Sequence, residues 1–167
     1  MKKVTRILIF LWALVLLIAA MIFFFSSQDG ETSAQTSAGL VQWFARFLHP
    51  ELDTLSSKER WRILREVNYL VRKAAHFTEF ALLGASLRML FEKLRLRFPL
   101  ALAWVAGTLY AGTDELHQYF VGTRSAMIQD VGIDSAGVLF GAGAVTVILL
   151  LIRRRARKKQ TPAPENP

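Results

Sequence analysis

The chain has 167 residues, a length that allows one domain, and 53% of them are hydrophobic although 21 are lysine or arginine and the net charge is +8. Cysteine is absent, which excludes disulfides and thiolate metal sites, and with three histidines a metal site would depend on carboxylates. The basic residues flank apolar blocks, and no nucleic-acid-binding motif accompanies them. This placement favours anionic lipid and control of membrane topology over nucleic acid, so no nucleic-acid partner is expected.

Four apolar segments predict an all-α, polytopic membrane protein. The first, residues 7–25, contains 19 residues without a charge, enough to cross a hydrocarbon core of ~30 Å. It is longer than the apolar part of a signal peptide and is followed by a poor cleavage sequence, so we interpret it as an uncleaved anchor. The other expected spans are residues 74–91, 99–121 and 133–152.

The long connection between the first two spans predicts a helical hairpin outside the cytoplasm. Residues 37–48 place five apolar side chains on one helical face, a pattern typical of an interfacial helix that His49 and Pro50 would end. Ser56 and Glu59 then have the spacing of a capping box. We expect the helix that begins there to run directly into the second span.

Lysine and arginine counts predict which way the chain faces. Thirteen of the 21 lie on the side that holds both termini, and eight lie on the other side over longer connections. The prediction is therefore a multi-pass protein of the cell inner (plasma) membrane with both termini in the cytoplasm. Residues 1–152 would form the membrane domain and residues 153–167 a basic tail, disordered over 161–167.

This topology brings ionisable residues from three separate segments to the outer leaflet. Charges are costly in lipid, so these residues should face one another or a water-filled cleft. On helical spacing, Arg72 shares a face with His76 and Glu79, and Asp114 aligns with its neighbours one turn later. We therefore predict a ligand-binding site formed by Arg72, His76, Glu79, Asp114, Glu115, His117, Gln118, Arg124, Asp130 and Asp134.

The last of these segments also carries small residues beneath its aspartates. Asp130, Asp134, Gly137 and Gly141 form one stripe, so Gly137-xxx-Gly141 predicts a close helix contact within the monomer. A purely local role is an alternative for Asp134, which would then cap the fourth helix and hold its backbone N–H groups.

Four motifs together resemble the VanZ-like membrane proteins, over residues 7–152. They are FFSSQ at 24–28, RKAAHFTEF at 72–80, DELHQYF at 114–120, and DVGIDSAG at 130–137 preceded by Arg124. One departure is visible, since the family often has Pro-Gly before the arginine and this chain has Gly122-Thr123. The resemblance implies an envelope role, because the family is named for a protein that lowers bacterial susceptibility to the lipoglycopeptide teicoplanin. It supplies no reaction.

Three interpretations of the polar residues stay open from the sequence. In the first, a buried ionic network is structural, with Arg72 and Arg124 neutralising Glu79, Asp114 or Asp130. In the second, Arg72, Lys73 and Arg124 hold the phosphate or carboxylate of an amphiphile, such as a membrane lipid or a lipid-linked envelope molecule. The oligomeric state is not predicted.

The third interpretation is a membrane enzyme acting on a lipid-linked substrate. Its catalytic candidates are His76, Glu79, Asp114 and His117, because each histidine lies one helical turn from a carboxylate. Two helices would then supply a mixed histidine and carboxylate site for a divalent metal, or one histidine would act as a general base. No cofactor is evident beyond this metal option, and the sequence does not decide whether the chain is an enzyme.

Overall fold

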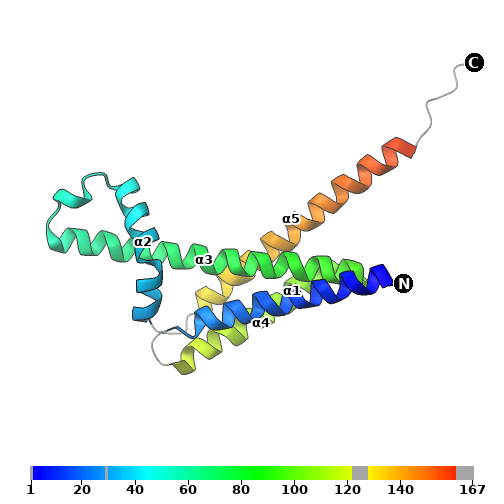
Figure 1. The fold of residues 1–167 in the computed structure, drawn as a ribbon, viewed down its shortest axis with the longest axis horizontal. Helices are drawn as coiled ribbons and strands as arrows, with labels where there is room; N and C mark the ends of the chain where they lie inside the picture. The colour runs from blue at the N-terminus through cyan, green and yellow to red at the C-terminus, as the bar shows by residue number, and fades with distance from the viewer. Residues whose placement is uncertain (1, 29, 122–127, 161–167) are drawn as a thin grey trace, which may run out of the picture.

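Five helices make up most of the described chain, which contains no strand. The computed structural model describes residues 2–28, 30–121 and 128–160. Its elements are α1 (Lys2–Ser26), α2 (Gly30–Leu48), the short 3-10 helix η1 (Leu52–Thr54), α3 (Ser57–Lys93), α4 (Pro99–Val121) and α5 (Ile128–Gln160) (Figure 1). The predicted all-α fold is therefore confirmed.

Helix α3 is the centre of the structure and packs against each of the other four. In Figure 1, α1, α3 and α4 run alongside one another, and α5 crosses them and projects beyond. The main core lies where these helices meet, and Ile22, Phe80, Leu90 and Val138 are fully buried in it. Ile22 belongs to α1, Phe80 and Leu90 belong to α3, and Val138 belongs to α5.

The contact between α3 and α5 depends on glycine. A Cβ atom on Gly141 would lie 1.8 Å from the carbonyl oxygen of Ala81, and one on Gly137 would lie 2.5 Å from that of Phe77. Both distances are far shorter than any contact between a real Cβ and an oxygen. The backbones of the two helices therefore approach as closely as the predicted Gly137-xxx-Gly141 contact requires.

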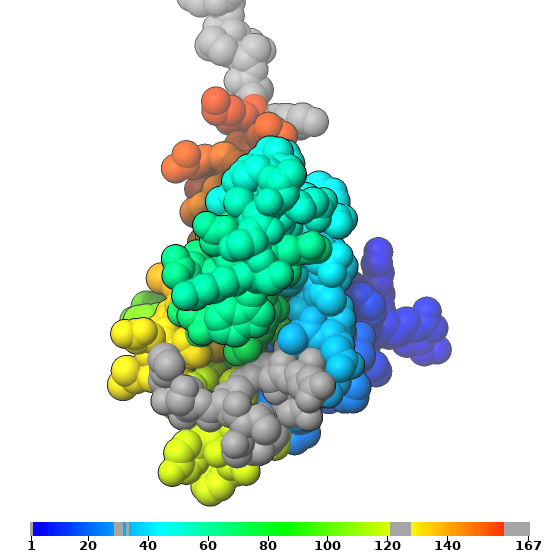
Figure 2. Space-filling view, turned by 90° about the vertical axis from the view of Figure 1, so that its left-hand side faces the viewer, coloured from blue at the N-terminus to red at the C-terminus, as the bar shows by residue number. Residues whose placement is uncertain are grey.

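Helices α2 and α3 form a hairpin with a small core of its own, in which Val41, Ala45, Leu52 and Val67 are buried. Helix α2 ends at Leu48 as expected but begins at Gly30 instead of residue 37. Figure 2 views the molecule from the side on which this hairpin projects.

The predicted capping box starts α3. The Ser56 hydroxyl accepts a hydrogen bond from the Glu59 backbone N–H, and the Ser56 N–H donates to the Glu59 carboxylate. The hydrogen bond from the Ser56 hydroxyl also lowers the pKa of Glu59. From this cap α3 continues without a break to Lys93, so the predicted helical continuity through residues 74–91 is confirmed.

At the other end, α3 closes with a Schellman motif that turns the chain into α4. The N–H of Leu96 donates to the carbonyl of Phe91, and that of Arg95 donates to Glu92, with Arg95 in the left-handed region at φ 59°. Nearby, Glu92 accepts hydrogen bonds from Arg88 and Arg153, which lower the pKa of Glu92. The bond from Arg153 fastens the end of α3 to α5.

Two of the described helices are long and apolar enough to cross a membrane by length and composition. They are α1 over Lys2–Ser26 and α5 over Ile128–Lys158. Helices α3 and α4 contain the other two expected spans but do not meet this criterion. Both helices have buried charged or amide side chains, and these lower the mean hydropathy of the segments that contain them.

Candidate functional site

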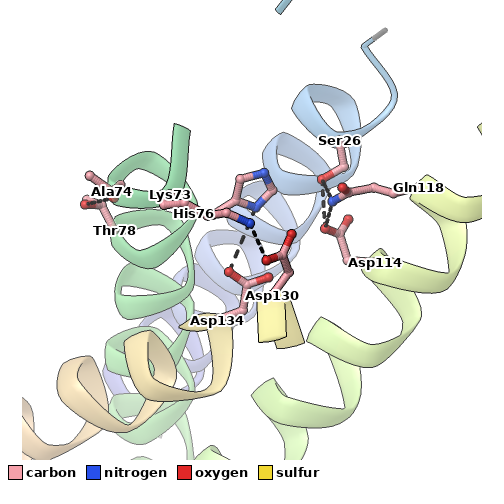
Figure 3. A network of polar contacts seen from close by, with 9 residues as sticks. All are labelled: Ser26, Lys73, Ala74, His76, Thr78, Asp114, Gln118, Asp130 and Asp134. Carbon is pink, nitrogen blue, oxygen red and sulfur yellow. Dashed lines mark hydrogen bonds and ion pairs between the residues drawn. The ribbon is translucent and has the colours of Figure 1, made fainter. Parts of the chain in front are cut away.

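Polar side chains are buried where the end of α1, the middle of α3, the last turns of α4 and the first turns of α5 meet. Asp114 and Asp134 are only 3% and 2% exposed, and Ser26, Glu115 and Gln118 are also buried. In Figure 3, Ser26 of α1, His76 of α3, Asp114 and Gln118 of α4, and Asp134 of α5 point toward one another. The interior of the bundle at this level is therefore polar, in contrast to the apolar core below it.

Asp114 is held by two hydrogen bonds to one of its oxygens. The Ser26 hydroxyl donates to Asp114 Oδ2 at 2.8 Å, and the Gln118 side-chain N–H donates to the same atom at 2.9 Å. Gln118 lies one turn after Asp114 on α4, as the spacing predicted. Ser26 was absent from the predicted site, although it belongs to a VanZ-like motif and is the first polar residue after the long apolar segment of α1.

His76, Asp114 and Asp134 bring three potential ligand atoms together from α3, α4 and α5. One such atom from each residue lies within 4.8 Å of the other two. His76 Nδ1 is 4.0 Å from Asp134 Oδ1 (Figure 3). This set differs from the two helical pairs considered from the sequence, because it takes one residue from each of three helices.

Lys73, and not Arg72, forms the ion pair with Asp130. Among the described side chains Arg72 makes no ion pair, and its buried Nε atom has no hydrogen-bond partner. The expected neutralisation of Glu79, Asp114 or Asp130 by Arg72 is therefore wrong for the described part of the chain. The Arg72 side chain instead lines the polar cavity together with Asp130 and Asp134 without forming an ion pair with either of them.

His117 faces α1. Its ring stacks on that of Phe23 with centroids 4.4 Å apart, and its Nε2 lies 3.1 Å from the Ser27 hydroxyl. Asp134 lies within α5, which begins at Ile128, so the alternative of an N-terminal cap is wrong for this residue. Arg124 lies outside the described residues.

Three hollows follow one another from the polar interior to the surface. The innermost is a polar cavity of about 10 Å³, lined by Arg72, Lys73, His76, Glu115, Gln118, Asp130, Ile133 and Asp134. The next, a middle pocket of about 270 Å³, shares Arg72 and His76 with it and extends to Phe25 and Ser37.

The third hollow is an apolar groove of about 620 Å³ between α2 and α3. It shares Leu40, Val71, Ala75 and Glu79 with the middle pocket. Glu79 lines both hollows and therefore lies where the apolar groove meets the polar part of the site. Arg72, His76 and Glu79 share the middle pocket, in agreement with the common helical face predicted for them.

Comparison with known proteins identifies a family. The VanZ/LLP1 family matches residues 10–151, which include the predicted motifs and the buried polar cluster. No curated protein and no solved structure was found to match the chain. Together with the two membrane-length apolar helices, the match fits a VanZ-like membrane protein. The chain therefore belongs to the VanZ/LLP1 family.

Proposed function

We propose that the chain crosses the inner membrane four times, with both termini in the cytoplasm and the α2–α3 hairpin outside. In Figure 1 the start of α1, the α3–α4 turn and the end of α5 lie at one end, and the hairpin lies at the other. The first of these ends carries the densest basic residues, as the positive-inside rule requires of a cytoplasmic face. Large apolar side chains cover the outer surface, including Phe10, Leu16, Leu109 and Phe140.

This topology predicts which positions react from outside the cell. Because the chain has no cysteine, single substitutions can be labelled without background. We expect Lys58→Cys, at the start of α3, to react with a membrane-impermeant maleimide in intact cells. Ala156→Cys, near the end of α5, should react only after the membrane is opened. Labelling of Ala156→Cys in intact cells, or of Lys58→Cys only after lysis, would contradict the orientation.

We propose that the function is to bind an anionic amphiphile of the cell envelope at the outer leaflet. The observation that carries this proposal is the continuity of the three hollows, which join an acyl-chain-sized apolar groove to a polar interior containing Arg72. The groove volume of about 620 Å³ is within the range of typical ligand sites, roughly 300–1,000 Å³. A headgroup and its chain would thus be bound in successive parts of one path.

Each part of the path has a chemical role in this proposal. The Arg72 guanidinium, which has no described carboxylate partner, would pair with a phosphate or carboxylate oxygen. Glu79, at the end of the apolar groove, would accept a hydrogen bond from a hydroxyl or ammonium group near the glycerol or sugar part of the ligand. The acyl chain would lie against Leu40, Phe44 and Leu70.

Blocking the groove tests the proposal without removing a charge. Ala75 lines both the apolar groove and the middle pocket, so Ala75→Trp should fill the path and abolish stoichiometric retention of an anionic lipid by the purified chain. The matched control is Leu82→Trp, which places the same side chain on an exposed part of α3 outside the three hollows. Native mass spectrometry after extraction from membranes containing phosphatidylglycerol measures the retained lipid. Equal retention by both variants would contradict the groove as the binding site.

We propose further that the protein lowers sensitivity to lipoglycopeptides such as teicoplanin, the effect for which the family is named, and that it does so through this binding. A lipoglycopeptide is itself an amphiphile with an acyl chain, so either the drug or the envelope lipid on which it acts suits the groove. Cells producing wild-type protein should then be less sensitive than cells producing the groove-blocked Ala75→Trp protein at equal abundance.

A further inference from the structure

We infer that His76, Asp114 and Asp134 form a binding site for one divalent cation. The three residues converge from α3, α4 and α5, and one ligand atom of each lies within 4.8 Å of the others. An imidazole nitrogen with two carboxylate oxygens is a common protein ligand set for first-row divalent metals. Two of the three, His76 and Asp134, also line the polar cavity, so one side of the site opens toward space that a further ligand can occupy.

The burial of Asp134 indicates that a positive partner belongs beside it. Its side chain is 3% exposed and accepts no hydrogen bond from any described residue, and its ion-pair contact, with His76, is 4.0 Å long. The nearby cation Lys73 is engaged with Asp130, one turn earlier on α5. A buried carboxylate without close compensation is costly. A dication between Asp114 and Asp134 would neutralise both.

The residues behind the site orient one of its ligands. Ser26 and Gln118 both donate hydrogen bonds to Asp114 Oδ2, and so hold that carboxylate from α1 and α4. Metal-binding carboxylates commonly have such outer-shell donors, which fix the direction of the remaining oxygen. This support also explains why a serine ends α1 at a position that is 1% exposed.

The ligand set favours Zn²⁺ or Mn²⁺ over Ca²⁺. Calcium takes six to eight oxygens, whereas this set has one nitrogen and two carboxylates. At metal–ligand distances of ~2.1 Å, neighbouring ligand atoms lie about 3.4 Å apart, so the three side chains would draw together by ~1 Å on binding. A fourth ligand would enter from the polar cavity, whose volume of about 10 Å³ corresponds to about one water molecule.

This inference does not depend on the amphiphile, because the three ligands belong to the chain. Metal binding is therefore tested in the absence of added lipid. A failure of metal binding would not contradict amphiphile binding, and a failure of amphiphile binding would not contradict metal binding, because each is measured separately.

The test measures metal bound to the purified full-length chain after chelator treatment and dialysis against Zn²⁺ or Mn²⁺. We expect one equivalent by elemental analysis, and a thermal unfolding midpoint that rises when the metal is returned. Asp134→Asn and His76→Gln should each weaken binding at least tenfold and lose this rise. Asp53→Asn and His49→Gln, which replace an exposed acid and an exposed histidine of the hairpin, are matched controls that should bind as wild type does.

Two results would overturn the inference. One is folded wild-type protein, with its ordinary unfolding transition, that retains no stoichiometric metal. The other is a loss of metal in Asp53→Asn as large as that in Asp134→Asn, which would indicate general attraction to acidic residues instead of a defined site. A variant that fails to fold is replaced by Asp134→Glu, which keeps the charge, displaces the carboxylate, and should bind more weakly than wild type.

Discussion

Replacing Gly141 with alanine is expected to destabilise the protein by about 3 kcal/mol, the upper part of the range for overpacking a tight contact. The added methyl group would lie 1.8 Å from the carbonyl oxygen of Ala81, which belongs to backbone and cannot rotate away. The two helices would have to separate, and the alignment of His76 with Asp134 would be lost with them. Unfolding of the purified protein in detergent by heat or by titration with a denaturing detergent measures the change.

Gly143 provides the matched control on the same helix. A Cβ atom there would meet no other atom within 4 Å, so alanine at this position adds no clash. Because alanine favours helix over glycine by up to ~1 kcal/mol, Gly143→Ala should be neutral or slightly stabilising. Equal stabilities for the two variants would show that α3 and α5 do not pack at the close distance described.

Replacing Arg72 with alanine is expected to weaken binding of an anionic amphiphile by about 10- to 100-fold. A hydrogen bond to a charged group contributes ~1.5–3 kcal/mol, and each 1.4 kcal/mol corresponds to about a factor of ten. The loss should be specific to the headgroup. Calorimetric titration with lysophosphatidic acid, compared with a monoacylglycerol of the same chain length, separates the headgroup from the chain.

Two other variants make the Arg72 result interpretable. Arg72→Lys keeps the charge but not the bidentate geometry, so its affinity should fall between those of wild type and Arg72→Ala. Arg65→Ala removes an exposed arginine of the same helix that stacks on Trp61, outside the three hollows, and should bind as wild type does. If Arg65→Ala and Arg72→Ala lose affinity equally, the effect is that of general charge and Arg72 has no special place in the site.

The helical fold could be predicted because its causes are local. The length of the first apolar segment predicted α1, and Pro99 predicted the start of α4. The spacing of Ser56 and Glu59 predicted the start of α3. The glycine contact could also be predicted, since small residues four apart lie on one helical face. The early start of α2 could not, because residues 30–36 are polar and have no apolar periodicity.

Several residues of the polar cluster could be predicted, although Ser26 was missed, but their pairing could not. Helical spacing shows which residues of one helix share a face, and it correctly placed Gln118 with Asp114. Pairs across helices depend on the rotation of each helix about its axis. Because of that rotation, His117 stacks on Phe23 of α1, and Asp130 forms its ion pair with Lys73 instead of with Arg72.

The same cluster explains why two predicted spans are difficult to recognise by apolarity. Helices α3 and α4 carry His76, Glu79, Asp114 and Glu115 at the level where an ordinary span would be apolar. These groups face other helices or the three hollows. The surface of the bundle therefore remains apolar although the mean hydropathy of each of the two helices is lower. Topology predicted from flanking charge does not depend on that average.

The most direct test of amphiphile binding is photocrosslinking with a lysophosphatidic acid that carries a diazirine at the end of its acyl chain. We predict adducts on the residues that line the apolar groove, Leu40, Phe44 and Leu70 above all, and their loss in Ala75→Trp. Adducts spread over the lipid-facing surfaces of α1 and α5, at positions such as Phe10 and Phe140, and unchanged in Ala75→Trp, would contradict the account.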